Sequence, residues 1–155
     1  NHLRTFARET ELAGIASPSL ADYPGAGAAG GLGYALLAYL KAELHSGIDI
    51  MLDLANFDEA IKDADLVVTG EGKSDEQTLM GKVPHGVLRR CKKLGVPVWL
   101  LSGSIEDTSG ILTKSFDFIR SINDGDNRPI SVLLQADVAK ENLTKTMKNL
   151  IIKRQ

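Results

Sequence analysis

The sequence predicts an α/β fold in which a mostly parallel sheet is flanked by helices. Two short runs, residues 65–69 and 96–101, are rich in apolar and β-branched side chains and have the composition of buried strands. Between them, residues 84–94 carry apolar side chains at helical spacing. Strand, helix and strand in this order form a βαβ unit, whose crossover is right-handed in nearly all proteins. The two strands are therefore expected to be parallel neighbours.

Before this unit the chain is expected to be helical apart from connecting segments. Helical spacing of apolar residues covers 2–13, whereas the prolines within 15–24 favour a connector. A further helix is expected at 32–44, after a glycine-rich segment. Residues 48–54 fit either a strand or a short helix, and 58–63 fit a short helix. The side chains expected to face inward are Leu32, Leu36, Leu37 and Leu40 in the longer helix and Phe57, Ala60 and Ile61 in the shorter one.

The remaining elements follow from local signals. Pro84 suits the first turn of the helix between the two strands, and Gly95 marks the end of that helix. Residues 116–122 are expected to form a third strand, and residues 130–152 a C-terminal helix. The positions expected to face inward are Val87, Leu88, Cys91 and Leu94 in the first of these helices and Val138, Leu143, Met147 and Leu150 in the last.

The composition is that of a soluble globular domain. The chain has 155 residues, of which 43% are hydrophobic and 25% charged, so it can bury a core without disulfides or a structural metal. The net charge of −2 disfavours a nucleic-acid partner, because surfaces that bind nucleic acid are usually basic. A basic cluster on the helix at 84–94 is interpreted as a solvated helix face. Its members are Arg89, Arg90, Lys92 and Lys93.

Neither a membrane partner nor export is expected. No stretch has the length of a transmembrane helix, and the first residues do not resemble a signal peptide. The single cysteine, Cys91, cannot form an internal disulfide and is expected to be buried, which is consistent with a reducing, cytoplasmic location. The chain begins with Asn1 and not with Met, so we interpret its start as a cut through a longer protein or as a processed end.

Small residues follow both strands of the βαβ unit, at 70–75 and at 102–104. Ligands of parallel sheets bind outside the carboxyl ends of the strands. Glycines there let backbone N–H groups approach a phosphate or carboxylate closely. Glycines that only form tight turns explain the same residues equally well, and the two interpretations stay open at this point.

The first of these loops also concentrates charge. Residues 71–76 hold three carboxylates and a lysine, the groups that phosphoryl transfer uses to bind Mg²⁺, to orient a hydroxyl and to screen phosphate charge. Helix capping is the alternative, because Ser74 and Gln77 have capping-box spacing. Glu71 lies between two glycines directly after the strand and has no capping role in that scheme. It is the strongest candidate on local grounds.

The pair Gly81 and Lys82 does not complete a Walker phosphate-binding loop. That motif requires glycine where Glu76 stands and serine or threonine where Val83 stands. Lys82 fits either a phosphate contact or a surface lysine. His85, in the first turn of the following helix, is interpreted as a packing or surface histidine in preference to a general base.

Other chemistries have weaker support. Gly25, Gly27 and Gly30 fit the dinucleotide fingerprint, but no strand is expected before them, so a nicotinamide dehydrogenase domain is a distant alternative. The same glycines also suit tight packing of a helix. One cysteine and three scattered histidines offer no zinc-ligand spacing.

Several ordered segments resemble one family, the type I glycerate kinases. Residues 24–33 resemble its glycine-rich signature. Residues 65–72, continued by Asp75, Gln77, Thr78, Gly81, Lys82, Pro84 and Gly86, resemble its second signature. Residues 46–49 with 57–58, and residues 95–98 with 102–103, also fit in order and spacing. The resemblance runs from about residue 1 to about residue 125.

The resemblance implies an enzyme that uses ATP and Mg²⁺ to phosphorylate D-glycerate at its 2-hydroxyl, giving 2-phosphoglycerate. It implies two α/β domains, one of them a Rossmann-like three-layer domain. On this basis residues 46–155 are expected to form the Rossmann-like domain. Residues 1–45 are expected to lie near the boundary to a second α/β domain that is mostly missing. The chain is then a fragment of a cytoplasmic enzyme that acts on small molecules and can form a homo-oligomer.

The resemblance also implies site residues. The catalytic candidates are Glu71, Asp75 and Lys82, with Asp75 as the Mg²⁺ ligand. The candidates for binding substrate or nucleotide are Gly25, Gly27, Gly30, Gly31, Gly70, Gly72, Thr78, Gly81, Ser102 and Gly103. Lys73 stands where arginine is common in the family. The alternative function is an isolated nucleotide- or hydroxy-acid-binding module without catalysis.

Overall fold

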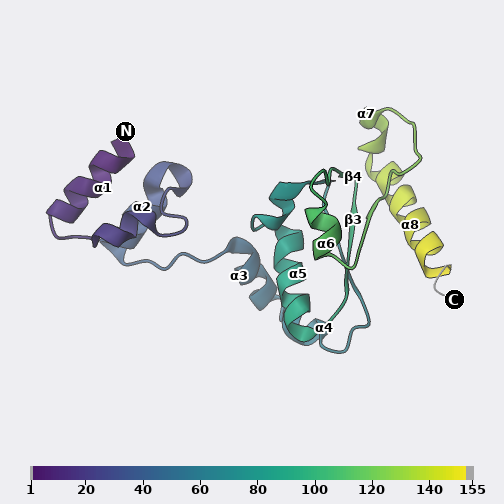
Figure 1. Ribbon diagram of the computed structural model, residues 1–155, viewed down its shortest axis with the longest axis horizontal. Coiled ribbons are helices and arrows are strands. Elements are labelled where there is room, and N and C mark those ends of the chain that lie inside the picture. The colour runs from purple at the N-terminus through teal and green to yellow at the C-terminus, as the bar shows by residue number, and fades with distance from the viewer. Residues whose placement is uncertain (1, 153–155) are drawn as a thin grey trace. The chain divides into compact units, whose positions relative to one another are not determined.

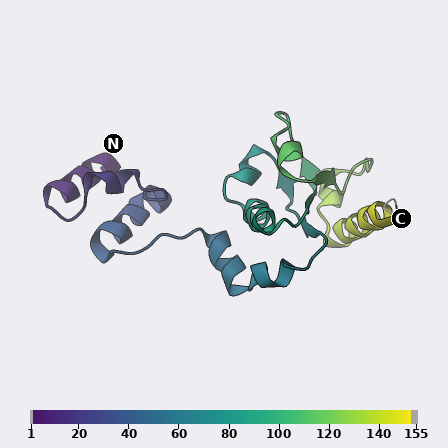
Figure 2. The ribbon, with the colours of Figure 1, turned by 60° about the horizontal axis from the view of Figure 1, so that its bottom comes forward.

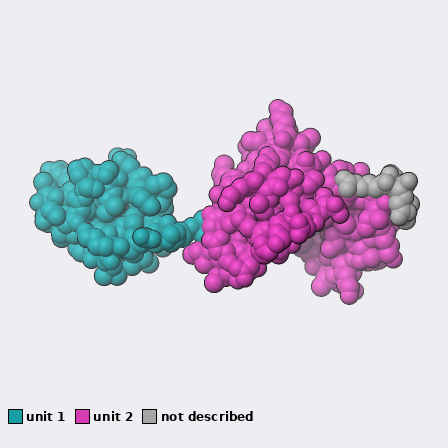
Figure 3. Space-filling model, turned by 90° about the horizontal axis from the view of Figure 1, so that it is seen from below, with its two compact units in different colours: residues 1–46 teal, residues 47–155 magenta. Residues whose placement is uncertain are grey.

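The computed structural model describes residues 2–152 of the chain, which form two compact units (Figure 3). The first unit comprises residues 1–46 and the second residues 47–155. Each has a hydrophobic core of its own, built around Tyr34 and Leu37 in the first unit and around Val98 in the second. Within residues 2–152, no helix combines the length and the apolar composition that crossing a membrane requires.

The N-terminal unit consists of α1 (His2–Leu12), a short 3₁₀ helix η1 (Pro18–Asp22) and α2 (Ala28–Leu40). The prediction of a helix at 2–13 is confirmed. Helix α2 ends at Leu40 and not at Leu44, because Lys41 takes a left-handed conformation with φ 53°. The Lys41 ammonium donates to the Ala38 carbonyl at 2.8 Å, which helps to close the end of the helix.

The inward face of α2 differs from the predicted one. Leu37 is buried as expected, but Leu32 and Leu40 are exposed. A close approach to the glycine-rich segment selects another face, since a Cβ at Gly33 would lie 2.3 Å from the carbonyl oxygen of Gly25. The side chains that turn inward instead are Tyr34 and Ala38.

The glycine-rich segment has no strand before it in the described part of the N-terminal unit, because η1 stands there. Ala29, Gly30 and Gly31 have φ values of 51°, 69° and 95°, so α2 is kinked and its regular part begins after Gly31. The dinucleotide fingerprint requires a strand directly before its first glycine. The structure therefore does not support the dehydrogenase alternative.

The C-terminal unit contains a parallel three-stranded sheet in the order β1-β3-β5 (Figure 1). Its strands are β1 (Val67–Thr69), β3 (Val98–Ser102) and β5 (Phe118–Ser121). All three predicted strands are confirmed, as is α5 (Val83–Leu94), which connects β1 to β3. A second parallel pair, β2 (Lys73–Ser74) with β4 (Ser104–Ile105), was not predicted.

Helices flank this sheet, as predicted for an α/β fold. Figures 1 and 2 show α3 (Gly47–Leu54), α4 (Phe57–Ile61) and α5 on one side and α8 (Ala136–Ile152) on the other. Residues 48–54 thus form a helix, not a strand. A short α6 (Ile111–Ser115) was not predicted, and the expected C-terminal helix is divided into α7 (Ile130–Leu133) and α8.

The main core lies between the sheet and helices α3 to α5. Val98, Leu100 and Cys91 are fully buried there, and burial raises the pKa of the Cys91 thiol to about 11. Leu94 was expected to complete the apolar stripe of α5 but is exposed, because it ends the helix at the left-handed Gly95. Ala60 is exposed too, since in so short a helix only Phe57 and Ile61, four residues apart, share the core-facing side.

The opposite face of the sheet is partly covered. Trp99 is buried against Phe118, with ring centroids 5.0 Å apart, whereas Val68 on the edge strand β1 is 41% exposed. Alternate residues of a strand point to opposite faces, and the described helices leave β1 uncovered on this side. On the core-facing side Val67 and Thr69 are half-buried. The strand predicted at 65–69 is therefore present, but it is only partly buried.

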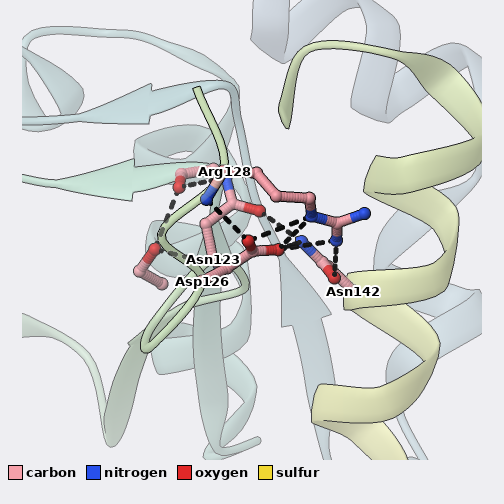
Figure 4. Close-up of polar contacts among 6 residues, drawn as sticks. Asn123, Asp126, Arg128 and Asn142 are labelled. Carbon is pink, nitrogen blue, oxygen red and sulfur yellow. Dashed lines mark hydrogen bonds and ion pairs between the residues drawn. The ribbon is translucent and has the colours of Figure 1, made fainter. Parts of the chain in front are cut away.

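A polar network attaches α8 to the loop after β5 (Figure 4). The buried Asn142 donates to Asn123 Oδ1 at 2.8 Å and to Asp126 Oδ2 at 3.0 Å, and it accepts from Arg128 Nη2 at 3.2 Å. The Arg128 guanidinium holds the pKa of the Asp126 carboxyl well below its usual range. Because Asn142 takes an inward position on α8, the neighbouring Leu143, which was predicted to face inward, is exposed.

Part of the basic cluster of α5 forms ion pairs with the neighbouring helices. Arg90 forms ion pairs with Asp53 and Asp58, and Arg89 pairs with Asp49 at 2.5 Å. The prediction of a solvated face holds for the exposed Lys92 and Lys93. It is wrong for Arg90, whose side chain is 19% exposed, because carboxylates of α3 and α4 surround its guanidinium.

Candidate active site

The candidate site lies where β1 and β3 end, and its two loops run side by side. The N–H groups of Gly103 and Ser104 donate to the carbonyls of Glu71 and Gly72, at 3.2 and 3.1 Å. A Cβ at Gly103 would lie 2.5 Å from Gly72 O, and one at Gly70 would lie 1.9 Å from Leu101 O. Glycine is therefore required at 70 and 103 by the contact between the loops. The Gly103 N–H already donates to a carbonyl of this chain.

Glu71 is the centre of a cluster of polar side chains. Its Oε1 accepts from Ser74 Oγ at 3.0 Å and from Thr78 Oγ1 at 2.5 Å. Its Oε2 lies 3.7 Å from Lys82 Nζ, and Asp75 Oδ1 lies 3.7 Å from the same nitrogen. The three predicted catalytic residues thus meet in one place. Two carboxylates and one ammonium can together hold a cation, a phosphate and a hydroxyl.

A capping box is present, but one residue later than predicted. Asp75 caps the 3₁₀ helix η2 (Glu76–Leu79), accepting from the Gln77 N–H at 3.0 Å, while Thr78 Oγ1 accepts from the Asp75 N–H at 3.0 Å. Ser74 cannot be the cap, because it is paired with Ile105 in the β2–β4 ladder. Asp75 therefore combines a capping role with its place beside Lys82.

Lys82 is presented by a tight turn before α5. Gly81 has a φ of 90°, and its N–H donates to His85 Nδ1 at 3.2 Å. His85 thus stabilises the turn, which agrees with its interpretation as a packing histidine. Lys82 is the N-cap residue of α5 and points its ammonium back to Glu71 and Asp75.

The other predicted site residues lie in different surroundings. Lys73 pairs with Glu106 at 2.7 Å, a hydrogen bond that raises the pKa of its ammonium, and Lys73 is not part of the Glu71 cluster. Thr78 and Ser102 are buried, whereas Gly72 and Gly81 are exposed. The glycines of the other signature belong to the N-terminal unit and are described within it alone: Gly25, Gly27, Gly30 and Gly31.

Sequence reasoning missed the contribution of Ser74, which it considered only as a cap. Ser74 is fully buried, and its Oγ lies 2.6 Å from Ser102 Oγ at the end of β3. A serine that follows a buried strand is a weak signal, because the contact joins residues 28 positions apart. The register of the two loops creates it.

A cavity of about 860 Å³ lies elsewhere, between α8 and the loop after β5. It is lined by residues of both charges, including Arg120, Asp124 and Lys145. The charged groups nearest to Asn142 already pair with one another, as Asp126 does with Arg128. Within residues 2–152, no group of three or more His, Cys, Asp and Glu could hold a metal ion. The Glu71 cluster is the better candidate, because it lies at the carboxyl ends of parallel strands, where ligands bind.

A model of the Glycerate kinase family matches residues 1–154. The chain belongs to this family. It is 45% identical over 128 residues to the glycerate kinase of Bacillus cereus, which covers 82% of this chain and 33% of that protein. It is 52% identical over 91 residues to the glycerate 2-kinase of Escherichia coli, covering 59% of this chain and 24% of that protein.

A solved structure agrees with this assignment to the glycerate kinase family. The crystal structure of the protein designated glycerate kinase 2 from Salmonella typhimurium matches with a TM-score of 0.51 at 34% identity. The match covers 81% of this chain and 33% of that one. The resemblance inferred from the signatures is thus confirmed, as is the α/β fold class. The chain spans about a third of the length of the relatives with the widest coverage.

Proposed function

We propose that this chain takes part in phosphoryl transfer from ATP to D-glycerate, giving 2-phosphoglycerate. The observation that carries the proposal is the meeting of Glu71, Asp75 and Lys82 at the carboxyl ends of the parallel strands, in a member of the glycerate kinase family. This edge of a parallel sheet is where ligands bind. Charges of both signs at one place suit a reaction whose catalysis rests on positioning and on electrostatic stabilisation.

Each residue of the cluster has a role in this proposal. The Lys82 ammonium binds a phosphate oxygen of ATP and screens the charge of the transferred group. Glu71, through Oε2, accepts a hydrogen bond from the hydroxyl that is phosphorylated. The main chain of the glycine-rich segment, at Gly25, Gly27, Gly30 and Gly31, contacts the substrate or the nucleotide. Gly72 and Gly81, both exposed, do the same in the C-terminal unit.

Magnesium fits the carboxylates of the cluster. Protein-bound Mg²⁺ is commonly held by one or two carboxylates together with substrate phosphates and water, so it needs no cage of three protein ligands. Asp75 is the carboxylate that we assign to it, because its side chain is held by the cap and borders Lys82. The ion would neutralise negative charge on the phosphates of ATP.

The test is glycerate-dependent formation of ADP, measured with this chain and with the product of the longest reading frame that contains it. Glu71→Gln keeps the size of the side chain and removes its charge. We expect it to lower kcat by about 100-fold or more, the range for loss of a group that acts on the reacting proton. The matched control is Glu106→Gln, which alters an exposed carboxylate that pairs with Lys73 outside the cluster and should leave kcat unchanged.

Each outcome has a distinct meaning. Unchanged activity of Glu71→Gln would remove Glu71 from the mechanism. Absence of ADP with both folded proteins would overturn the assignment of glycerate as substrate. Calorimetric binding of ATP or glycerate without turnover in either protein would favour the alternative, a binding module without catalysis.

A further inference from the structure

A chain of buried hydroxyl groups leads from the end of β3 to the carboxylate of Glu71. Ser102 Oγ lies 2.6 Å from Ser74 Oγ, and Ser74 Oγ lies 3.0 Å from Glu71 Oε1. Thr78 Oγ1 reaches the same carboxylate oxygen at 2.5 Å. All three hydroxyl-bearing side chains are at most 1% exposed, whereas the Glu71 side chain is 19% exposed. The hydroxyls therefore act from behind the carboxylate, away from solvent.

The direction of donation follows from counting protons. An ionised carboxylate only accepts hydrogen bonds, and a hydroxyl has one proton to donate. Ser74 and Thr78 must each donate their proton to Glu71 Oε1. Ser74 then has none left for Ser102, so Ser102 is the donor in the contact between the two serines. The order of donation is Ser102 to Ser74 to Glu71.

We propose that Ser74, Ser102 and Thr78 are positioning residues, which fix Glu71 in one orientation and present its Oε2 to the reacting hydroxyl. The inference rests on the function proposed above. It changes the expected role of Thr78 and Ser102 from direct contact with a ligand to action through Glu71, since both are buried and both donate within the chain. Hydrogen bonds from behind a reactive side chain lock its rotamer, and a reaction is sensitive to such preorganisation.

The first test is a double-mutant cycle in the product of the longest reading frame, with Ser74→Ala, Glu71→Gln and both together. We expect Ser74→Ala alone to lower kcat about tenfold with the KM values for ATP and glycerate nearly unchanged. In the Glu71→Gln background the same change should lower kcat less than about twofold, because residues that act through one another are not additive. A full tenfold loss in both backgrounds, or no loss in either, would overturn the proposal.

A second pair of variants does not depend on how the Ser74 variant folds. Thr78→Val keeps the shape of the side chain but removes the hydroxyl, whereas Thr78→Ser keeps the hydroxyl and is smaller. We expect Thr78→Val to lower kcat and Thr78→Ser to restore it to within about twofold of the unmodified enzyme. Equal losses in both would show that the methyl group matters and would contradict the proposal. The control is Ser121→Ala, which removes a hydroxyl that donates to Gly103 O at the end of β5 and has no bond to Glu71.

Failure of the proposed function can be told apart from failure of this inference. If the unmodified protein forms no ADP with glycerate, the proposed function is overturned. The contact between Ser74 and Ser102 is then tested by thermal unfolding of Ser74→Ala, Ser102→Ala and the double variant. If the double variant lowers the unfolding midpoint by less than the sum of the two single shifts, a direct contact between the two serines is supported. If its shift equals that sum, the contact is overturned.

Discussion

At the scale of single residues, Lys82 determines the charge of the candidate site. Its ammonium lies 3.7 Å from Glu71 and 3.7 Å from Asp75, so the three side chains together carry one negative charge. A phosphate that binds Lys82 must compete with these carboxylates, and it adds negative charge to them. A cation beside Asp75 would relieve that repulsion. The proposed order of roles, with Mg²⁺ on Asp75 and phosphate on Lys82, follows from this balance.

Cys91 permits a prediction about reactivity and pH. It is the single cysteine of the sequence, it is fully buried, and burial raises the pKa of its thiol from 9.0 to about 11. The thiolate is the reactive form, so we expect a thiol reagent such as DTNB to react slowly with the folded protein at pH 8 and fast in denaturant. Fast labelling of the native protein would contradict the buried position.

The same thiol should weaken the fold at high pH. Its pKa is higher in the folded than in the unfolded chain, so its contribution to stability is complete below about pH 9 and decreases as the pH rises toward 11. Cys91→Ala, compared with the unmodified protein in urea unfolding at pH 8 and pH 10.5, isolates this effect. The unmodified protein should lose more stability between the two pH values than the variant does.

At the scale of elements, helix α8 is attached to the sheet partly through polar side chains. Of the residues of α8 that were predicted to face inward, Val138 alone is buried, whereas Asn142 provides hydrogen bonds to the loop after β5. Hydrogen bonds of this kind contribute roughly 1 kcal/mol each when their partners are satisfied. Helix α8 should therefore be loosened more easily than the packed core of β3 and α5.

Asp126 tests this attachment. We expect Asp126→Asn to speed hydrogen exchange at the amides of α8 and to leave β3 unchanged, because the change removes the charge that pairs with Arg128. The matched control is Asp124→Asn, which affects a pair with Arg120 at 3.8 Å that is more exposed. Equal protection of α8 in both variants would show that the network does not hold the helix.

Acid should act in the same direction as Asp126→Asn. The pKa of the Asp126 carboxyl is lower in the folded than in the unfolded chain, where it is about 3.9, so its contribution to stability is present above that pH and is lost as the pH falls further. Exchange measured at pH 7 and pH 3, each corrected for the intrinsic rate, should show α8 losing protection at the lower pH. The Asp126→Asn variant should show a smaller change.

The elements with strong local signals could be predicted from the sequence. Strand β3 is a continuous apolar run. Helix α5 has apolar side chains at helical spacing, a proline in its first turn and a glycine directly after its last residue. All of these signals are local. The β2–β4 pair has two residues in each strand, and its pairing is created by loops that meet in three dimensions. The sheet face at Val68 was judged wrongly because β-branched composition does not reveal whether a second layer covers an edge strand.

The candidate site, like the fold, could be predicted only where its residues are close in sequence. Glu71, Asp75 and Lys82 lie within one short stretch, so a turn of the chain is enough to bring them together. The hydroxyl chain was not predictable, because Ser74 and Ser102 meet through the register of separate loops. Capping was placed one residue too early because strand pairing at Ser74 competes with the start of η2.

At the scale of the whole molecule, residues 41–46 have no regular secondary structure and join units with separate cores. Exposed segments of this kind are the preferred sites of limited proteolysis. We expect a glutamate-specific protease to cut first after the exposed Glu43 and to leave a fragment that retains the β1-β3-β5 sheet. Mass spectrometry of the early products checks this, and first cuts after Glu71 or Glu106 would contradict it.

The bonds between the loops after β1 and β3 have a consequence for how this part of the family can vary. Gly103 and Ser104 donate to Glu71 and Gly72, and glycine is required where the two backbones touch. An insertion or deletion in one loop would shift every one of these partners by a residue. Loops on a protein surface usually change length freely. Here the two lengths are coupled, so a natural variant with a longer first loop should carry a compensating change of length in the second.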